Sequence, residues 1–161
     1  MALALTLAKQ PRVLLLDEPV AALDPLARRH FLGTLADAVA AGGLTVVLSS
    51  HLVADIERVC DHLTLLASSR VQLCGDIEGL LDEHRVLVGP RKDTTAIERD
   101  HTVVQTERTA RQTTMLVRLN GPVADPEWEA EDVGLEELVL AYMGADAAPQ
   151  ITELTAAGGT R

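Results

Sequence analysis

Residues 13–19 read Val-Leu-Leu-Leu-Asp-Glu-Pro, four aliphatic residues followed at once by two carboxylates. A short aliphatic run of this kind predicts a strand buried on both faces of a parallel sheet. Asp17 and Glu18 then lie at the carboxyl end of that strand, the edge where open α/β sheets bind ligands. Because adjacent residues that leave a strand point opposite ways, the two carboxylates can take different tasks.

Taken alone, this stretch is also compatible with an ordinary strand that ends in two solvated charges. Two further patterns favour a site. Residues 22–25 read Ala-Leu-Asp-Pro, and Ser49-Ser50-His51 follow the next aliphatic run, Thr45–Leu48. The ends of two neighbouring parallel strands therefore carry polar side chains, which we expect to lie close together.

The remaining chain alternates between strand and helix patterns, which predicts an α/β fold with a mainly parallel sheet. Helices are expected over residues 2–9, 25–41, 52–60, 76–81 and 135–143. Strands are expected over residues 13–16, 45–48, 63–66, 71–73, 86–88, 103–105 and 115–119, with a turn at Ser68-Ser69. From Ala145 the chain is rich in Ala, Gly and Thr, and we expect a disordered tail.

Composition narrows the function classes. The formal charge is −10, with 24 acidic and 14 basic residues, and such a field repels nucleic-acid backbones. No uncharged run approaches the roughly 20 apolar residues of a membrane-spanning helix, so direct membrane insertion is not expected. Cys60 and Cys74 lie in no metal-binding spacing and are expected to be reduced, as in a cytoplasmic protein.

The three patterns resemble, in order and spacing, the Walker B, D-loop and H-loop motifs of ATP-binding-cassette (ABC) ATPases. The matching stretches are VLLLDEP, ALDP and TVVLSSH, and ALALTLAKQP resembles the helix that follows the family's signature loop. The resemblance covers about residues 2–83. It implies a partial RecA-like P-loop NTPase sheet with flanking helices, and we expect a small α+β appendage after it.

The resemblance also implies roles for single residues. Asp17 would bind Mg²⁺ through water, and Glu18 would be the general base for ATP hydrolysis. Asp24 would contact a partner subunit across the bound nucleotide, and His51 would hydrogen-bond the γ-phosphate. The other histidines, His30, His62, His84 and His101, match no motif and are expected to be surface or packing residues.

By the same resemblance, residues 1–85 are the C-terminal part of an ABC ATPase core, residues 86–144 the appendage and residues 145–161 a tail. The family implies ATP and Mg²⁺ as cofactors, with a membrane permease and a second ATPase subunit as partners. It also implies a peripheral position at the inner face of the cell membrane. The final helix, GLEELVLAYMG, favours the exporter or multidrug type.

The phosphate-binding loop G-x-x-x-x-G-K-[ST] does not occur in the sequence. Its two lysines, Lys9 and Lys92, follow Ala8 and Arg91 rather than glycine. The signature loop is also missing, and Met1 falls inside a helix pattern, as it would in a fragment. We therefore expect the isolated chain to bind ATP negligibly and to hydrolyse none. Because two strands lack their shared neighbour, we also expect it to be poorly stable or to close its sheet in a rearranged order.

Two other function classes stay open on the sequence. The chain can be a non-catalytic interaction protein that pairs with a complete ABC cassette and contributes only its motif surfaces. Cassette proteins of DNA repair or translation share the same motifs, but the acidic charge and 2% aromatic content disfavour nucleic-acid binding.

Overall fold

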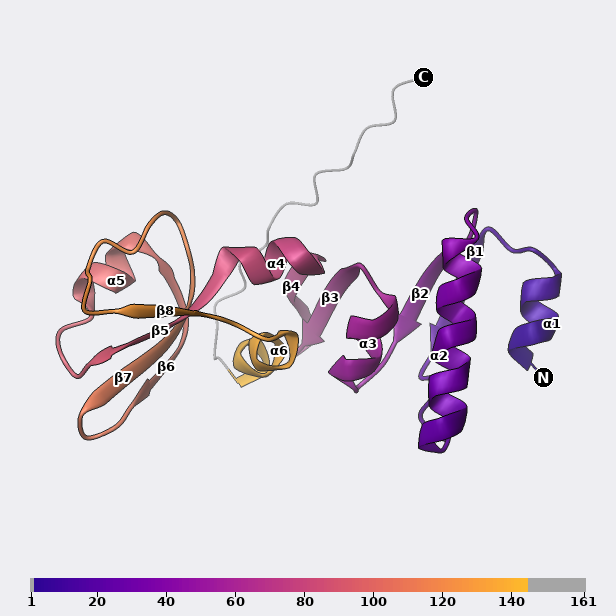
Figure 1. Cartoon of the computed structure of the whole chain (residues 1–161), viewed down its shortest axis with the longest axis horizontal. Helices are drawn as coiled ribbons and strands as arrows, with labels where there is room; N and C mark the ends of the chain where they lie inside the picture. The colour runs from indigo at the N-terminus through magenta and orange to yellow at the C-terminus, as the bar shows by residue number, and fades with distance from the viewer. Residues whose placement is uncertain (1, 145–161) are drawn as a thin grey trace, which may run out of the picture. The chain divides into compact units, whose positions relative to one another are not determined.

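The computed structural model describes residues 2–144, a mixture of helices and strands (Figure 1). The helices are α1 (Ala2–Ala8), α2 (Pro25–Ala40), α3 (Val53–Val59), α4 (Ile77–Glu83), α5 (Thr95–Asp100) and α6 (Leu135–Gly144). The strands are β1 (Val13–Asp17), β2 (Thr45–Ser49), β3 (His62–Ala67), β4 (Arg70–Asp76), β5 (His84–Pro90), β6 (Thr102–Arg108), β7 (Gln112–Arg118) and β8 (Glu129–Asp132). The expected α/β class is confirmed; the tail expected over residues 145–161 lies outside the described part.

The chain divides into two compact units, residues 1–60 and residues 61–161. The first unit holds α1 to α3 with β1 and β2, and the second holds the remaining elements. The division expected after residue 85 lies inside the second unit, because β4 and α4 pack against α6 there. That the part of the chain resembling an ABC ATPase core ends at residue 85 stays a prediction.

In the first unit, β1 and β2 pair in parallel, from Val13 opposite Thr45 to Asp17 opposite Ser49. The helix α2 begins where expected, with Asp24 as its cap and Pro25 in its first turn. It is followed by Gly42, whose φ of +86° is a left-handed conformation that a residue with a Cβ rarely adopts. The predicted strand–helix–strand order is confirmed here.

The expected burial of β1 and β2 on both faces is wrong for the described residues. Leu14 is buried at 7% exposure, but Leu15 is 73% exposed and Val47 opposite it is 56% exposed. Alternate residues of a strand point to opposite faces, so one face of this two-stranded sheet is packed and the other is open. In the same unit, Leu32 and Leu35 of α2 are also buried.

In the second unit, β3 and β4 form an antiparallel hairpin. Its turn is Ser68-Ser69, as expected, and both residues have positive φ, 50° and 59°. That pair of left-handed residues matches the right-handed twist of hairpin strands. Within residues 2–144, the parallel pairing expected of the sheet is therefore restricted to β1 and β2.

Four antiparallel strands in the order β6-β7-β5-β8 make the main sheet of the second unit. One buried cluster lies on this sheet, made of Leu87, Ile97, Met115, Val117 and Trp128. Two elements here, α5 and β8, were not expected from the sequence. The strand β8 reads Glu-Ala-Glu-Asp, is exposed throughout, and exists because β5 offers it backbone partners.

None of the described helices is long and apolar enough to cross a membrane.

Candidate functional site

The carboxylate of Asp17 lies at the end of β1, directly opposite Ser49 at the end of β2. The hydroxyl of Ser49 donates a hydrogen bond of 2.6 Å to Oδ1 of Asp17. The parallel pairing of two aliphatic strands therefore brings the side chains after them together, as the sequence predicted. One oxygen of Asp17 is oriented by this bond.

Glu18 is the next residue, and its backbone has a φ of +44°, in the left-handed region. Its backbone N–H donates to Oγ of Ser49 over 2.9 Å, so the same hydroxyl group serves both acidic residues. Such a conformation costs a non-glycine residue about 1 kcal/mol or more, and the Ser49 contact offsets part of that cost. The turn aims Glu18 away from the direction that an extended strand would give it.

His51 follows β2 and reaches the side chain of Glu18. Its Nδ1–H donates to Oε2 of Glu18 over 2.8 Å, with 64% of the His51 side chain and 39% of the Glu18 side chain exposed. At this exposure the contact contributes little stability, because water competes for both groups. The hydrogen bond instead fixes the relative positions of the two side chains, so that Glu18 and His51 face one another at an open edge of the sheet.

Asp24 lies apart from this group in the contacts that the structure gives. Its Oδ1 accepts hydrogen bonds from the N–H groups of Leu26 (3.0 Å) and Ala27 (2.9 Å) at the start of α2. This is the arrangement of a helix cap, which satisfies backbone donors that have no partner inside the helix. The contact to a partner subunit that the resemblance implies for Asp24 stays a prediction.

A metal site must be judged from the residues present. Among the described residues, no three His, Cys, Asp or Glu side chains are grouped closely enough to hold a metal ion. Mg²⁺ commonly keeps several waters and takes one or two carboxylates together with substrate phosphates. Asp17, with one oxygen oriented by Ser49 and both on an exposed side chain, fits that single-carboxylate role.

Ser49 is the member of this hydrogen-bonded group to which the sequence patterns assign no role. The feature that could have identified it is its position in the strand register. Ser49 is the last residue of β2 and lies directly opposite Asp17. Ser50 has a different task, since its Oγ accepts from the N–H of Leu52 (3.1 Å) in the turn that leads into α3. Of the histidines set aside, His84 and His101 are buried and His30 and His62 exposed, as expected for packing and surface residues.

Comparison with protein families gives one match, over residues 1–54, which hold β1, β2 and the site. The matching model is described as "AAA domain, putative AbiEii toxin, Type IV TA system". An AAA domain is a P-loop ATPase domain, which agrees with the expected partial RecA-like sheet.

Similar curated proteins are ATP-binding proteins of transporters. The Energy-coupling factor transporter ATP-binding protein EcfA2 of Symbiobacterium thermophilum is 46% identical over 74 residues, 46% of this chain and 25% of the relative. The Nod factor export ATP-binding protein I of Mesorhizobium japonicum is 37% identical over 82 residues, 51% of this chain and 24% of the relative. The Thiamine import ATP-binding protein ThiQ of Vibrio parahaemolyticus is 36% identical over 70 residues, 44% of this chain and 30% of the relative.

The matched part of the chain thus spans less than a third of the length of each of these relatives. Their names include both import and export. The resemblance that the three motifs predicted is confirmed: over about half of its length, this chain is similar to the ATP-binding proteins of transporters.

Proposed function

We propose that this chain carries the hydrolytic half of an ABC transporter ATPase site and that it acts as, or as part of, the ATP-binding subunit. The observation that supports this most is the hydrogen-bonded group of Asp17, Glu18, Ser49 and His51 at the carboxyl ends of β1 and β2. It joins the motifs of two separate stretches of sequence into one site. The relatives named above match about half of this chain.

Asp17 would hold Mg²⁺ through water, and the ion would neutralise phosphate charge when ATP is bound. Glu18 would accept the proton of the attacking water, since a carboxylate beside the reacting phosphate can act as general base. Ser49 would hold Asp17 and the backbone of Glu18 in place. These roles use contacts that already exist between the side chains.

His51 would contact the γ-phosphate with its second ring nitrogen while Nδ1–H keeps its bond to Glu18. In a neutral ring that second nitrogen is an acceptor, so it can donate to phosphate only when the ring is protonated. His51 would then orient both the base and the phosphate that the water attacks.

The phosphate clamp is not encoded in these 161 residues, which contain no G-x-x-x-x-G-K-[ST] loop. Without a lysine and a cradle of N–H groups, Asp17 and Glu18 present negative charge to a negative ligand. We therefore propose that ATP and Mg²⁺ act at this site only together with phosphate-binding residues supplied from outside the sequence. The chain alone would bind neither of them there.

We further propose the surroundings of an exporting ABC ATPase for this chain. Its partners would be a membrane permease and a second ATPase subunit, which Asp24 would contact, at the cytoplasmic face of the membrane. Support for the export direction comes from the short amphipathic helix α6, which buries Leu135, Leu138, Val139 and Tyr142. The net charge of −10 supports a protein partner over nucleic acid.

The proposed inactivity can be tested with an assay of ATP hydrolysis on the isolated chain. Incubated with Mg·ATP, it should release no phosphate above the rate of a Glu18→Gln variant, because no residue clamps the nucleotide. Phosphate release would be followed by a colorimetric assay, with folding checked by circular dichroism. Turnover by the parent chain that Glu18→Gln abolishes would show that the phosphate clamp is not needed.

A further inference from the structure

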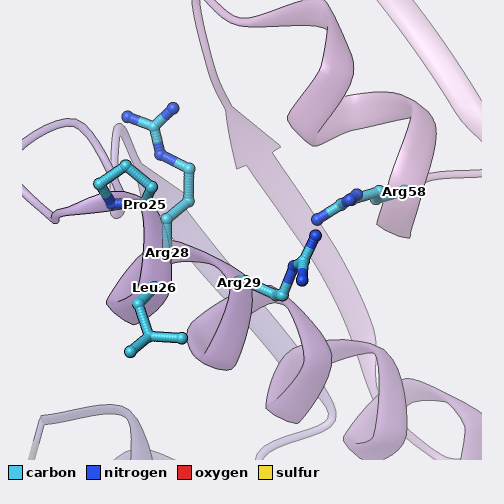
Figure 2. A pocket seen from close by; sticks show the side chains of 5 residues that line it. All are labelled: Pro25, Leu26, Arg28, Arg29 and Arg58. Atoms are coloured by element: carbon cyan, nitrogen blue, oxygen red, sulfur yellow. The ribbon is translucent and has the colours of Figure 1, made fainter.

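Three arginines of the first unit line one hollow on its surface. Arg28 and Arg29 belong to α2 and Arg58 to α3; with Pro25 and Leu26 they surround a space of about 420 Å³ (Figure 2). This is a local positive group in a chain whose formal charge is −10. We infer that the hollow binds a small, soluble, phosphate-bearing anion.

The three guanidinium groups lack acidic partners within residues 2–144. No ion pair or hydrogen bond of the described part reaches the side chains of Arg28, Arg29 or Arg58, and Nε of Arg28 is buried without a partner. In the second unit, by contrast, Arg85 and Arg118 each pair with a carboxylate, Asp132 and Glu83. The guanidinium groups that line the hollow are therefore not neutralised by a carboxylate of the described part, and a buried polar atom such as Nε of Arg28 is costly without a hydrogen bond.

The arrangement of two of these groups calls for an anion between them. Figure 2 shows the guanidinium groups of Arg29 and Arg58 pointing toward one another from α2 and α3, while Arg28 extends away past Pro25. Two like charges that face each other repel, and a multivalent anion placed between them turns the repulsion into two attractions. Each guanidinium offers a planar fork of donors that matches phosphate oxygens in pairs.

The start of α2 is not what makes the site. The N–H groups of Leu26 and Ala27, which have no partner inside the helix, donate to the side chain of Asp24 and are not available to a ligand. The Asp24 carboxylate also offsets the partial positive charge of the helix end. The arginine side chains alone therefore supply the donors for a ligand.

The size of the ligand follows from the charge of the whole chain. At physiological salt, charges are screened beyond about 8 Å, so a compact anion in the hollow feels mainly the arginines. An extended polyanion, such as nucleic acid or an anionic membrane surface, would also meet the acidic remainder of the protein. Leu26, which is 66% exposed beside the arginines, offers contact to an apolar part of the ligand. The class that fits is a small phosphorylated compound.

Pyrophosphate is a suitable probe, titrated calorimetrically without metal into the full chain. We expect saturable binding, weakened about tenfold by Arg29→Gln or Arg58→Gln, because each removes one charge-assisted contact, and more by the double variant. Arg111→Gln is the matched control: it removes the same charge from an exposed arginine of the second unit, outside the hollow. Circular dichroism establishes that all variants are folded.

Three outcomes would overturn the inference. One is the absence of pyrophosphate binding to the folded parent chain. Another is an equal loss of affinity in Arg111→Gln, which would indicate a response to overall charge. The third is binding to vesicles that contain phosphatidylglycerol without binding to pyrophosphate, which would identify a lipid surface as the ligand. None of these depends on hydrolysis at Glu18.

Discussion

Glu18 combines a strained backbone with an exposed carboxylate. A left-handed φ of +44° at a residue with a Cβ persists only where the surroundings favour it, and such positions concentrate at functional sites. Here the Ser49 hydroxyl accepts from the Glu18 N–H and donates to Asp17, so one side chain stabilises the turn and orients the neighbouring acid. The geometry therefore adds support to the roles that the sequence assigned to Asp17 and Glu18.

A buried histidine in the second unit gives the chain a pH dependence. His84 is fully buried; its Nδ1–H donates to the carbonyl of Leu80 (2.6 Å), and its Nε2 accepts from the Tyr142 hydroxyl (2.8 Å). Burial lowers the pKa of His84 below its usual 6.5, although the Leu80 carbonyl opposes the change. The folded chain therefore keeps this ring neutral at a pH where the unfolded chain protonates it.

The sign of the effect follows from proton counting. As pH falls below about 6.5, the unfolded state binds more protons than the folded state, so the free energy of unfolding decreases. We predict that urea unfolding of the second unit, followed by the fluorescence of Trp128, shifts to lower urea in acid. The shift should be smaller in His84→Gln and unchanged in His30→Gln, which alters an exposed ring. The same acid shift in His84→Gln as in the parent would rule out His84 as the cause.

Most of the site could be predicted from residue order alone. Asp17, Glu18 and His51 were predicted together because they follow two aliphatic runs, and parallel strands end at a common edge. Ser49 was not assigned a role, since a serine after a strand is common and its bonds depend on which residue lies opposite. Asp24, by contrast, could be predicted from its neighbours in the sequence. An Asp directly before a Pro predicts a helix cap, and the structure shows that cap.

At the scale of elements, aliphatic runs predicted the existence of β1 and β2 but not their burial. Burial depends on which other elements cover each face, and in the first unit only one face of the pair is packed. The strand β8 was missed for a related reason, because its charged sequence has no alternation and its pairing with β5 is a tertiary event. Short helices such as α5, with six residues, lie below the length at which periodicity is informative.

One close contact in the main sheet offers a test of its packing. A Cβ built on Gly89 of β5 would lie 2.7 Å from Cε3 of Trp128, so the indole ring packs directly on the glycine backbone. We predict that Gly89→Ala lowers the free energy of unfolding of the second unit by about 1–3 kcal/mol, because the ring must shift. Trp128 fluorescence in urea measures it, with Gly134→Ala as the control, since a Cβ there meets nothing within 4 Å. Equal stability of the parent and Gly89→Ala would contradict this packing.

At the scale of the whole chain, the two compact units have different characters. The first unit holds the Asp17, Glu18 and His51 group on a sheet of two strands, a size that is marginal for independent stability. Its exposed aliphatic side chains include Leu15 and Val47, which lie on the open face of that sheet. The second unit has its own four-stranded sheet and buried cluster. Poor stability of the isolated chain stays a prediction that this contrast supports.

The most direct measurement uses a chimera that supplies the missing clamp. A segment that carries a G-x-x-x-x-G-K-[ST] loop would be joined ahead of this chain, and hydrolysis of Mg·ATP measured. The chimera should hydrolyse ATP; Glu18→Gln should lower the rate at least about 100-fold, as expected on removal of a general base, while Glu57→Gln, an exposed glutamate of α3, should leave it near the parent rate. A folded chimera that is inactive, or one whose rate is unchanged by Glu18→Gln, would contradict the claim that this chain carries the hydrolytic half of an ABC ATPase site.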